Sequence, residues 1–114
     1  GRSLRVTLDL RPDPLPALPA AVEVAVYRIS GEALNNVVRH SGATSARLTL
    51  HAPSDRVTVE VADNGAGFPT GTSTAGVGLR SMAERAEELG GTFTAVNAPA
   101  GAVVRAVLPR ERAG

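Results

Sequence analysis

The chain has 114 residues, enough for one domain whose hydrophobic core needs no disulfide or metal to hold it. Its hydrophobic fraction of 43% is that of an ordinary globular protein, and the lack of cysteine excludes disulfides and thiolate metal sites. The formal net charge is only +1, so we expect no nucleic-acid partner. The chain begins at Gly1 rather than methionine, so we expect one domain over 1–114 that belongs to a longer protein.

The first half of the chain combines a strand, a long helix and a hairpin. Residues 6–10 alternate apolar and polar side chains, as a half-buried strand does, and a proline-rich stretch follows them. Apolar residues recur at helical spacing from Ala20 to His40, and Ser41-Gly42 predicts the end of that helix. Residues 47–51 and 57–61 then alternate again on either side of a short turn, which predicts a hairpin.

The second half adds a loop, a shorter helix and a further pair of strands. Residues 68–78 are glycine-rich and aperiodic, which indicates a loop. Residues 79–89 have one apolar face and end at Gly90-Gly91, so they predict a helix. Residues 93–96 and 103–108 predict two strands, and a polar tail from Pro109 onward follows. Paired neighbouring strands favour an α/β fold, a two-layer α/β sandwich with a mixed, mostly antiparallel sheet and helices packed on one face.

Three short segments carry groups suited to a ligand. Glu32, Asn36 and His40 lie at i, i+4 and i+8, so they form one polar stripe on the long helix. An asparagine carbonyl one turn from a carboxylate can serve Mg²⁺, which takes few ligands from protein and the rest from phosphates and water. A solvated helix face explains the same spacing, so this segment alone decides nothing.

The second segment, Asp63-Asn-Gly-Ala-Gly67, directly follows a predicted strand. A carboxylate there can accept a hydrogen bond from an exocyclic amine such as that of adenine, and the glycines allow close approach of backbone. An ordinary turn is the competing interpretation.

The third segment, Gly76-Val-Gly-Leu79, begins the second predicted helix. The free backbone amides at a helix N-terminus favour binding of an anion. The competing interpretation is that the glycines only give the helix a flexible start.

In order and spacing, these segments resemble the N, G1 and G2 boxes of the ATPase domain that sensor histidine kinases share with type II topoisomerases. The flanking words are similar to the nitrate-sensor-like subgroup of histidine kinases. They read Tyr27-Arg-Ile-Ser-Gly-Glu-Ala-Leu-Asn-Asn-Val-Val-Arg-His-Ser-Gly-Ala43 and Gly78-Leu-Arg-Ser-Met-Ala-Glu-Arg-Ala-Glu-Glu-Leu-Gly-Gly91. The resemblance covers essentially the whole chain and implies a Bergerat fold that binds ATP with Mg²⁺.

The resemblance also implies roles for single residues. Asn36 would coordinate Mg²⁺, Glu32 would hold a water of that ion or act as a base, and Arg39 and His40 would lie near the phosphates. Asp63 would bind adenine. The implied ATP-binding set is Asn36, His40, Asp63, Gly65, Gly67, Gly76, Val77, Gly78 and Leu79. Gly76 and Gly78 would let a lid over 70–75 close on the triphosphate.

The implied activity is transfer of the γ-phosphoryl group to a histidine on a separate helical dimerisation domain, and then to a response regulator. Neither His40 nor His51 resembles that acceptor, so the isolated domain is expected to be unable to autophosphorylate. We expect it to be cytoplasmic and monomeric, with the parent protein free to be membrane-anchored. Many relatives have a threonine after the glycine of the last hairpin, where this chain has Ala102. Two alternatives stay open: an anti-sigma-factor-type serine kinase and a non-catalytic ATP-binding module.

Overall fold

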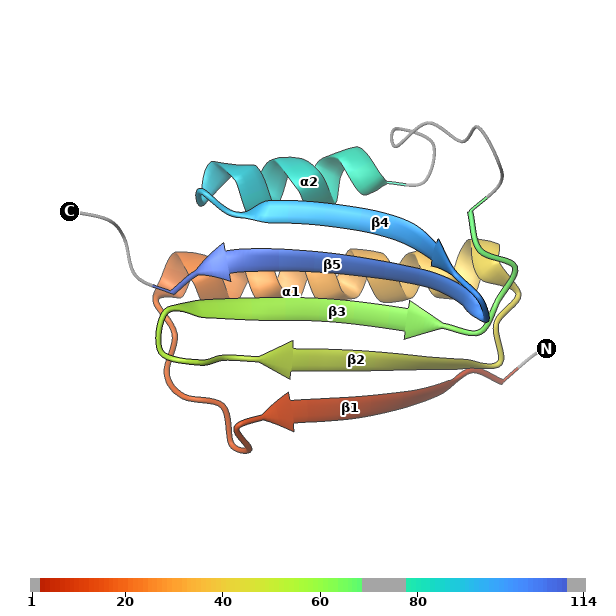
Figure 1. Cartoon of the computed structure of the whole chain (residues 1–114), viewed down its shortest axis with the longest axis horizontal. Helices are drawn as coiled ribbons and strands as arrows, with labels where there is room; N and C mark the ends of the chain where they lie inside the picture. Colours follow the sequence, from red (N-terminus) through yellow and green to blue (C-terminus); the bar gives the residue numbers. More distant parts are fainter. Residues whose placement is uncertain (1–2, 69–77, 111–114) are drawn as a thin grey trace.

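A computed structural model describes residues 3–68 and 78–110 of the chain. The elements run β1 (Arg5–Arg11), α1 (Ala20–Asn36), η1 (Val37–Ser41), β2 (Ser45–His51), β3 (Arg56–Asp63), α2 (Leu79–Glu88), β4 (Thr92–Ala98) and β5 (Gly101–Pro109). The five strands form one sheet in the order β1-β2-β3-β5-β4, in which β1 runs parallel to β2 and the other pairs are antiparallel. Both helices cover the same face of the sheet (Figure 1), which confirms the predicted two-layer sandwich.

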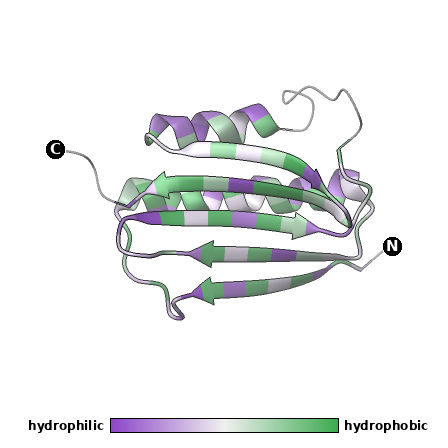
Figure 2. Cartoon of the chain, viewed as in Figure 1, coloured by the Kyte–Doolittle hydropathy of each residue, from purple (hydrophilic) through white to green (hydrophobic). Residues whose placement is uncertain are grey.

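The alternation along the central strand β3 builds the core (Figure 2). Val57, Val59 and Val61 are 0%, 1% and 2% exposed and face the helices, because side chains of a strand alternate between its two faces. The residues between them lie on the outer face, where Glu60 pairs with Arg105 of β5 at 2.7 Å. The hydrophobic pattern therefore fixes which face of the sheet can carry a buried site.

The long helix differs from its prediction in the last turn. The spacing predicted a regular helix as far as His40, but the α-helix ends at Asn36, and Val37–Ser41 forms a wider π-helical turn. The hydroxyl of Ser41 donates to the carbonyl oxygen of Val37 at 2.8 Å. That oxygen is the acceptor that an α-helix would offer to the backbone amide of Ser41, so the hydroxyl competes for it. The turn ends at Gly42, in the left-handed region with φ 66°, as predicted.

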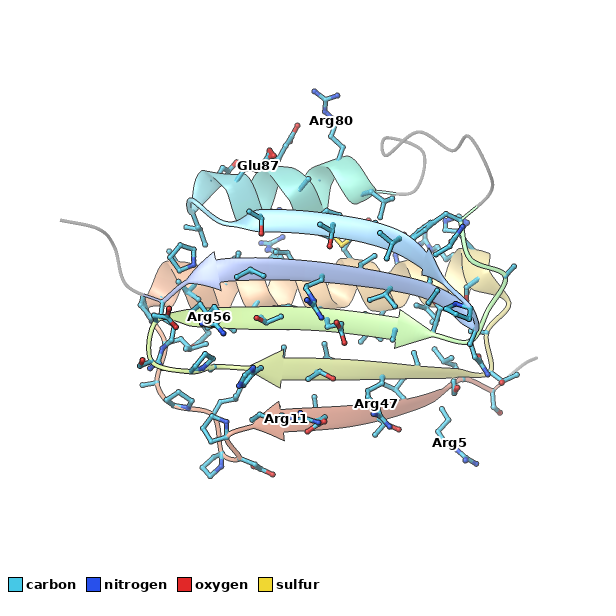
Figure 3. All side chains as sticks on the ribbon, viewed as in Figure 1. Arg5, Arg11, Arg47, Arg56, Arg80 and Glu87 are labelled. Carbon is cyan, nitrogen blue, oxygen red and sulfur yellow. The ribbon has the colours of Figure 1, made fainter. Side chains whose placement is uncertain are left out.

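The second helix matches its predicted bounds within a residue. Leu79, Met82 and Ala86 are buried against β4 and β5. Arg80 and Glu87 lie on the side turned away from the sheet (Figure 3). This arrangement places the N-terminus of α2 beside the C-terminal half of α1, where two of the candidate segments meet.

The edge strand β1 is less buried than its alternation predicted. Val6 and Leu8 share the helix side of the sheet with Ala46 and Leu48, yet they are 48% and 58% exposed. The reason is that α1 packs mainly on β3 and β5, so the helical layer leaves β1 largely uncovered.

The predicted start of the polar tail at Pro109 was also wrong. Strand β5 continues through Pro109, and the amide of Arg110 donates to the carbonyl of Asp55 at 3.1 Å.

Within the described ranges, neither helix has the length and hydropathy that a membrane crossing requires.

The glycine inside α1 provides a stability test. Gly31 is exposed, and a Cβ placed there would meet no atom within 4 Å. Since glycine costs about 1 kcal/mol relative to alanine inside a helix, Gly31→Ala should stabilise the domain by up to that amount. The expected rise in the thermal unfolding midpoint is about 4 °C. An unchanged or lower midpoint would contradict the expectation that a methyl group at this position meets open space and stabilises the helix.

Candidate nucleotide-binding site

A pocket of about 300 Å³ opens between the end of the long helix, the end of β3, the start of β5 and the start of α2. Its floor is apolar, and polar groups stand at its wall. The lining residues are Ala33, Asn36, Val37, His40, Ser41, Val61, Asp63, Ala66, Gly67, Phe68, Leu79, Ala102 and Val104. This volume lies at the small end of ligand pockets, and an apolar floor with a few convergent polar groups is their usual composition.

Asp63 is the carboxylate of this pocket. It is the last residue of β3, which brings it to the open end of the sheet beside the start of β5. Its Oδ1 accepts a hydrogen bond from the amide of Gly65 at 2.8 Å. Oδ2 makes no hydrogen bond with the described residues, so it can accept one from a ligand. A half-buried carboxylate held in this way can recognise a ligand amine while its own orientation is fixed.

The loop after β3 is tied to the end of η1 by hydrogen bonds. Asn64 accepts from the amides of Thr44 and Ser45 at 2.9 and 3.0 Å, and its own Nδ2 donates to the Thr44 hydroxyl at 3.0 Å. The amide of Ala66 donates to the carbonyl of Ser41 at 2.9 Å. A Cβ at Gly65 would collide with that same Ser41 carbonyl, which explains the glycine. The two candidate segments are therefore a single structural unit.

Two of the three residues of the predicted polar stripe line the pocket. Asn36 and His40 both line the pocket, whereas Glu32 lies beside it, against Gly78 at the N-terminus of α2. Glu32 and Asn36 are one turn apart in the regular α-helix, so the π-helical turn, which begins at Val37, alters the spacing of His40 and not that of Glu32. Arg39 is exposed and does not line the pocket.

The glycine segments contribute in different ways. Gly67, with φ 79°, and Leu79 line the pocket, whereas Gly65 does not line it and lies against Ser41. Gly78 precedes α2 with φ 73°, a left-handed conformation that glycine adopts without strain. A Cβ there would collide with the Glu32 carboxylate, so the glycine also permits this close approach. Gly76, Val77 and the expected lid over 70–75 lie outside the described residues.

Sequence reasoning missed most of the apolar lining. Val61 and Val104 pair across β3 and β5, and Ala33 and Val37 face them from the helix. In the sequence, these residues are indistinguishable from the rest of the core, because the same alternation serves a packed interior and a pocket floor. Asn97, near the end of β4, was not among the predicted site residues.

The chain matches the family model described as histidine kinase-, DNA gyrase B- and HSP90-like ATPase over residues 21–112. Sensor histidine kinase MctS of Rhizobium johnstonii is 38% identical over 99 residues, covering 82% of this chain and 21% of that protein. Sensor histidine kinase YxjM of Bacillus subtilis is 39% identical over 108 residues, 93% of this chain and 26% of that protein. The crystal structure of the ATP-binding domain of PrrB from Mycobacterium tuberculosis has a TM-score of 0.67 at 30% identity, covering 96% of this chain and 82% of that one.

The family match over residues 21–112, together with the α/β sandwich, defines the class of the chain as an ATPase-family domain. It belongs to the histidine kinase-, DNA gyrase B- and HSP90-like ATPase family, and its relatives are sensor histidine kinases. The chain spans about a fifth to a quarter of the length of these two relatives, 21% and 26%.

Substitution of Ala102 tests whether this position affects the affinity of the pocket for nucleotide. It is 5% exposed and lines the pocket from the start of β5, at the position where the family resemblance of the sequence led us to expect threonine. Ala102→Thr would add a hydroxyl that can donate to a ligand, and one hydrogen bond corresponds to about fivefold in affinity. We expect calorimetric titration with an ATP analogue to show tighter binding of about that size. Unchanged or weaker binding by a stably folded variant would contradict a role for this position.

Proposed function

We propose that this domain binds ATP together with Mg²⁺ and supplies the γ-phosphoryl group to a histidine on a separate helical dimerisation domain of the same protein. A response regulator would then receive the phosphoryl group, and the domain would work in the cytoplasm. The observation that carries the proposal is the convergence of Asn36, His40 and Asp63, from separate segments, on one pocket with an apolar floor. The sensor-kinase names of the relatives support the direction of transfer.

The base of the nucleotide would occupy the apolar part of the pocket. Val61 and Val104 form its floor, and Leu79 closes it from the helical layer. A flat, weakly hydrated base gains from such a surface, because its faces leave water. Asp63 Oδ2 would accept a hydrogen bond from the exocyclic amine of adenine, which distinguishes that base from one that presents a carbonyl there.

The triphosphate would lie toward the end of the long helix and the start of α2. The first amides of α2 point out of its N-terminus and favour negative charge. Asn36 would hold Mg²⁺ through its side-chain oxygen, which suits a hard cation that takes most of its ligands from phosphates and water. When bound, Mg²⁺ would supply charge neutralisation to the phosphates. His40 would donate to a phosphate oxygen from the pocket wall, and Arg39 would add positive charge from the exposed side.

Glu32 lies where it can help to order this end of the site. Its carboxylate lies against Gly78, next to the positive end of α2. We propose that it holds a water near the phosphates, or accepts a proton from the incoming imidazole. In the transfer, the bond between the γ-phosphorus and the β,γ-bridging oxygen breaks, a bond from phosphorus to the imidazole nitrogen forms, and ADP leaves. Positioning and electrostatic stabilisation supply most of the catalysis in such reactions.

The acceptor histidine would come from another domain. His40 belongs to the pocket wall, and His51 lies at the end of β2, in register with Arg11 and Thr58 on the opposite face of the sheet. The isolated domain should therefore bind ATP as a monomer without labelling itself. Its relatives are named sensor kinases, and the serine-kinase alternative has no observation in its favour.

Comparison of an Asn36 variant with a control variant at the neighbouring Asn35 tests the proposed role of Asn36 in binding Mg²⁺. Both are amides on α1, but Asn35 is exposed and does not line the pocket. Calorimetric titration with a non-hydrolysable ATP analogue should show that Mg²⁺ tightens binding by wild type and by Asn35→Ala. Asn36→Ala should lose most of that Mg²⁺ effect, about tenfold, while keeping its metal-free affinity. An equal Mg²⁺ effect in all three proteins would refute the role of Asn36.

A further inference from the structure

Asn97 makes a two-point contact with the backbone of Phe68. It lies near the end of β4, and its Oδ1 accepts a hydrogen bond from the Phe68 amide at 2.6 Å. Its Nδ2 donates to the Phe68 carbonyl oxygen at 3.0 Å. One side chain thus satisfies both backbone groups of a residue in a distant loop, which an amide can do because it carries a donor and an acceptor side by side.

The contact extends to the neighbouring glycine. A Cβ at Gly67 would lie 2.6 Å from Oδ1 of Asn97, so the asparagine occupies the space that any other residue at position 67 would fill. Gly67 also has φ 79°, in the left-handed region that favours glycine. The backbone of Gly67 and Phe68 is therefore fitted to the Asn97 side chain at two consecutive residues.

Both of these residues form part of the pocket wall. Gly67 and Phe68 line the pocket, whereas Asn97 does not. Asn97 is itself held by the β4–β5 hairpin, where it pairs with Ala102, another lining residue. The sheet thus supports the wall from behind, through one side chain that would not touch a ligand.

We propose that Asn97 is a positioning residue for nucleotide binding: it fixes the Gly67–Phe68 backbone in the place that completes the pocket wall. The inference rests on the proposed function for its ligand, and on the two hydrogen bonds between Asn97 and Phe68 for its geometry. We call the two hydrogen bonds between Asn97 and the Phe68 backbone the clamp. Without this clamp, the Gly67–Phe68 backbone would sample other positions, and nucleotide binding would carry the entropic cost of ordering it. Loss of Asn97 therefore weakens nucleotide affinity while it leaves the core of the fold intact, since the residue is exposed and outside the core cluster.

The test compares Asn97→Ala and Asn97→Asp with a control on the same strand, Thr94→Ala. Aspartate keeps the size of the side chain and its acceptor but loses the donor, so an oxygen faces the Phe68 carbonyl. Thr94 is exposed on the opposite face of β4. Three quantities are measured for each protein: hydrogen exchange of the Phe68 amide without ligand, affinity for a non-hydrolysable ATP analogue, and the thermal unfolding midpoint.

We expect both Asn97 variants to exchange the Phe68 amide about tenfold faster and to bind the analogue about tenfold more weakly, a loss consistent with one to two hydrogen bonds. Their unfolding midpoints should match that of Thr94→Ala. Unaltered exchange of Phe68 would overturn the clamp, and faster exchange with unaltered affinity would overturn its role in binding. If the wild type bound no nucleotide, the proposed function would fail, and the Phe68 exchange rates would still decide whether Asn97 positions the wall.

Discussion

Replacement of Asp63 by asparagine should weaken binding of an ATP analogue by about 100-fold, which corresponds to one charge-assisted hydrogen bond lost inside a pocket. The Oδ1 atom of Asp63 accepts a hydrogen bond from the Gly65 amide, and Oδ2 is the atom that would accept one from the ligand. Asparagine has only one oxygen, so its NH₂ group must face either the Gly65 amide or the adenine amine. Both of those are donors, and one pair is left unsatisfied. Calorimetric titration gives the affinity directly.

Asp55→Asn is the matched control for this variant. Asp55 lies in the turn between β2 and β3, and its side chain is 71% exposed and paired only with Arg56 in the described structure. We expect the control to bind like wild type. If Asp63→Asn also bound like wild type, while its fold remained intact, the assignment of Asp63 to the base of the nucleotide would be wrong.

Gly101→Ala should destabilise the domain by about 3 kcal/mol, at the upper end of what overpacking costs. A Cβ at Gly101 would collide with the carbonyl oxygen of Asp63 and lie 2.9 Å from the amide nitrogen of Gly65. Both are backbone atoms, one of the last residue of β3 and one of the loop that follows, so they cannot rotate away as a flexible side chain could. Urea denaturation should report the loss as a lower midpoint with an unchanged slope.

Gly31→Ala controls for the chemical change, because the same methyl group there meets open space. The two variants should therefore move the free energy of unfolding in opposite directions. Equal stability of Gly101→Ala and wild type would show that the hairpin and the Asp63 loop can separate without cost. In that case, the described packing would not hold Asp63 in place.

The sequence allowed the fold to be predicted because its periodic signals are strong. The alternation of apolar and polar residues around Val59 identifies β3 and the face that it buries. The helical spacing of apolar residues around Met82 does the same for α2. The exceptions have local causes. The hydroxyl of Ser41 disturbs the last turn of the long helix, and the edge position of β1 leaves Leu8 uncovered. Neither effect appears in a hydrophobic pattern, since one depends on a single hydrogen bond and the other on how far the helical layer extends.

The polar half of the site was accessible from the sequence, and the apolar half was not. Asp63 and Asn36 stand in short motifs whose spacing resembles a family, and both prove to line one pocket. Val61 and Val104 are ordinary alternating strand residues, so only the structure separates pocket floor from core. Asn97 could not be found because its partner is the backbone of Phe68, and backbone contacts leave no pattern in the sequence.

Backbone amide shift mapping of the wild-type domain with an ATP analogue and Mg²⁺ would show directly whether the nucleotide binds in the described pocket. We expect saturable shifts around the described pocket, at Asn36 to Ser41, at Val61 to Phe68 and at Ala102 to Val104. Thr7 and Thr49, which pair with neighbours on the opposite face of the sheet, should not shift. Shifts on that outer face, or none at millimolar analogue, would contradict a nucleotide site in this pocket.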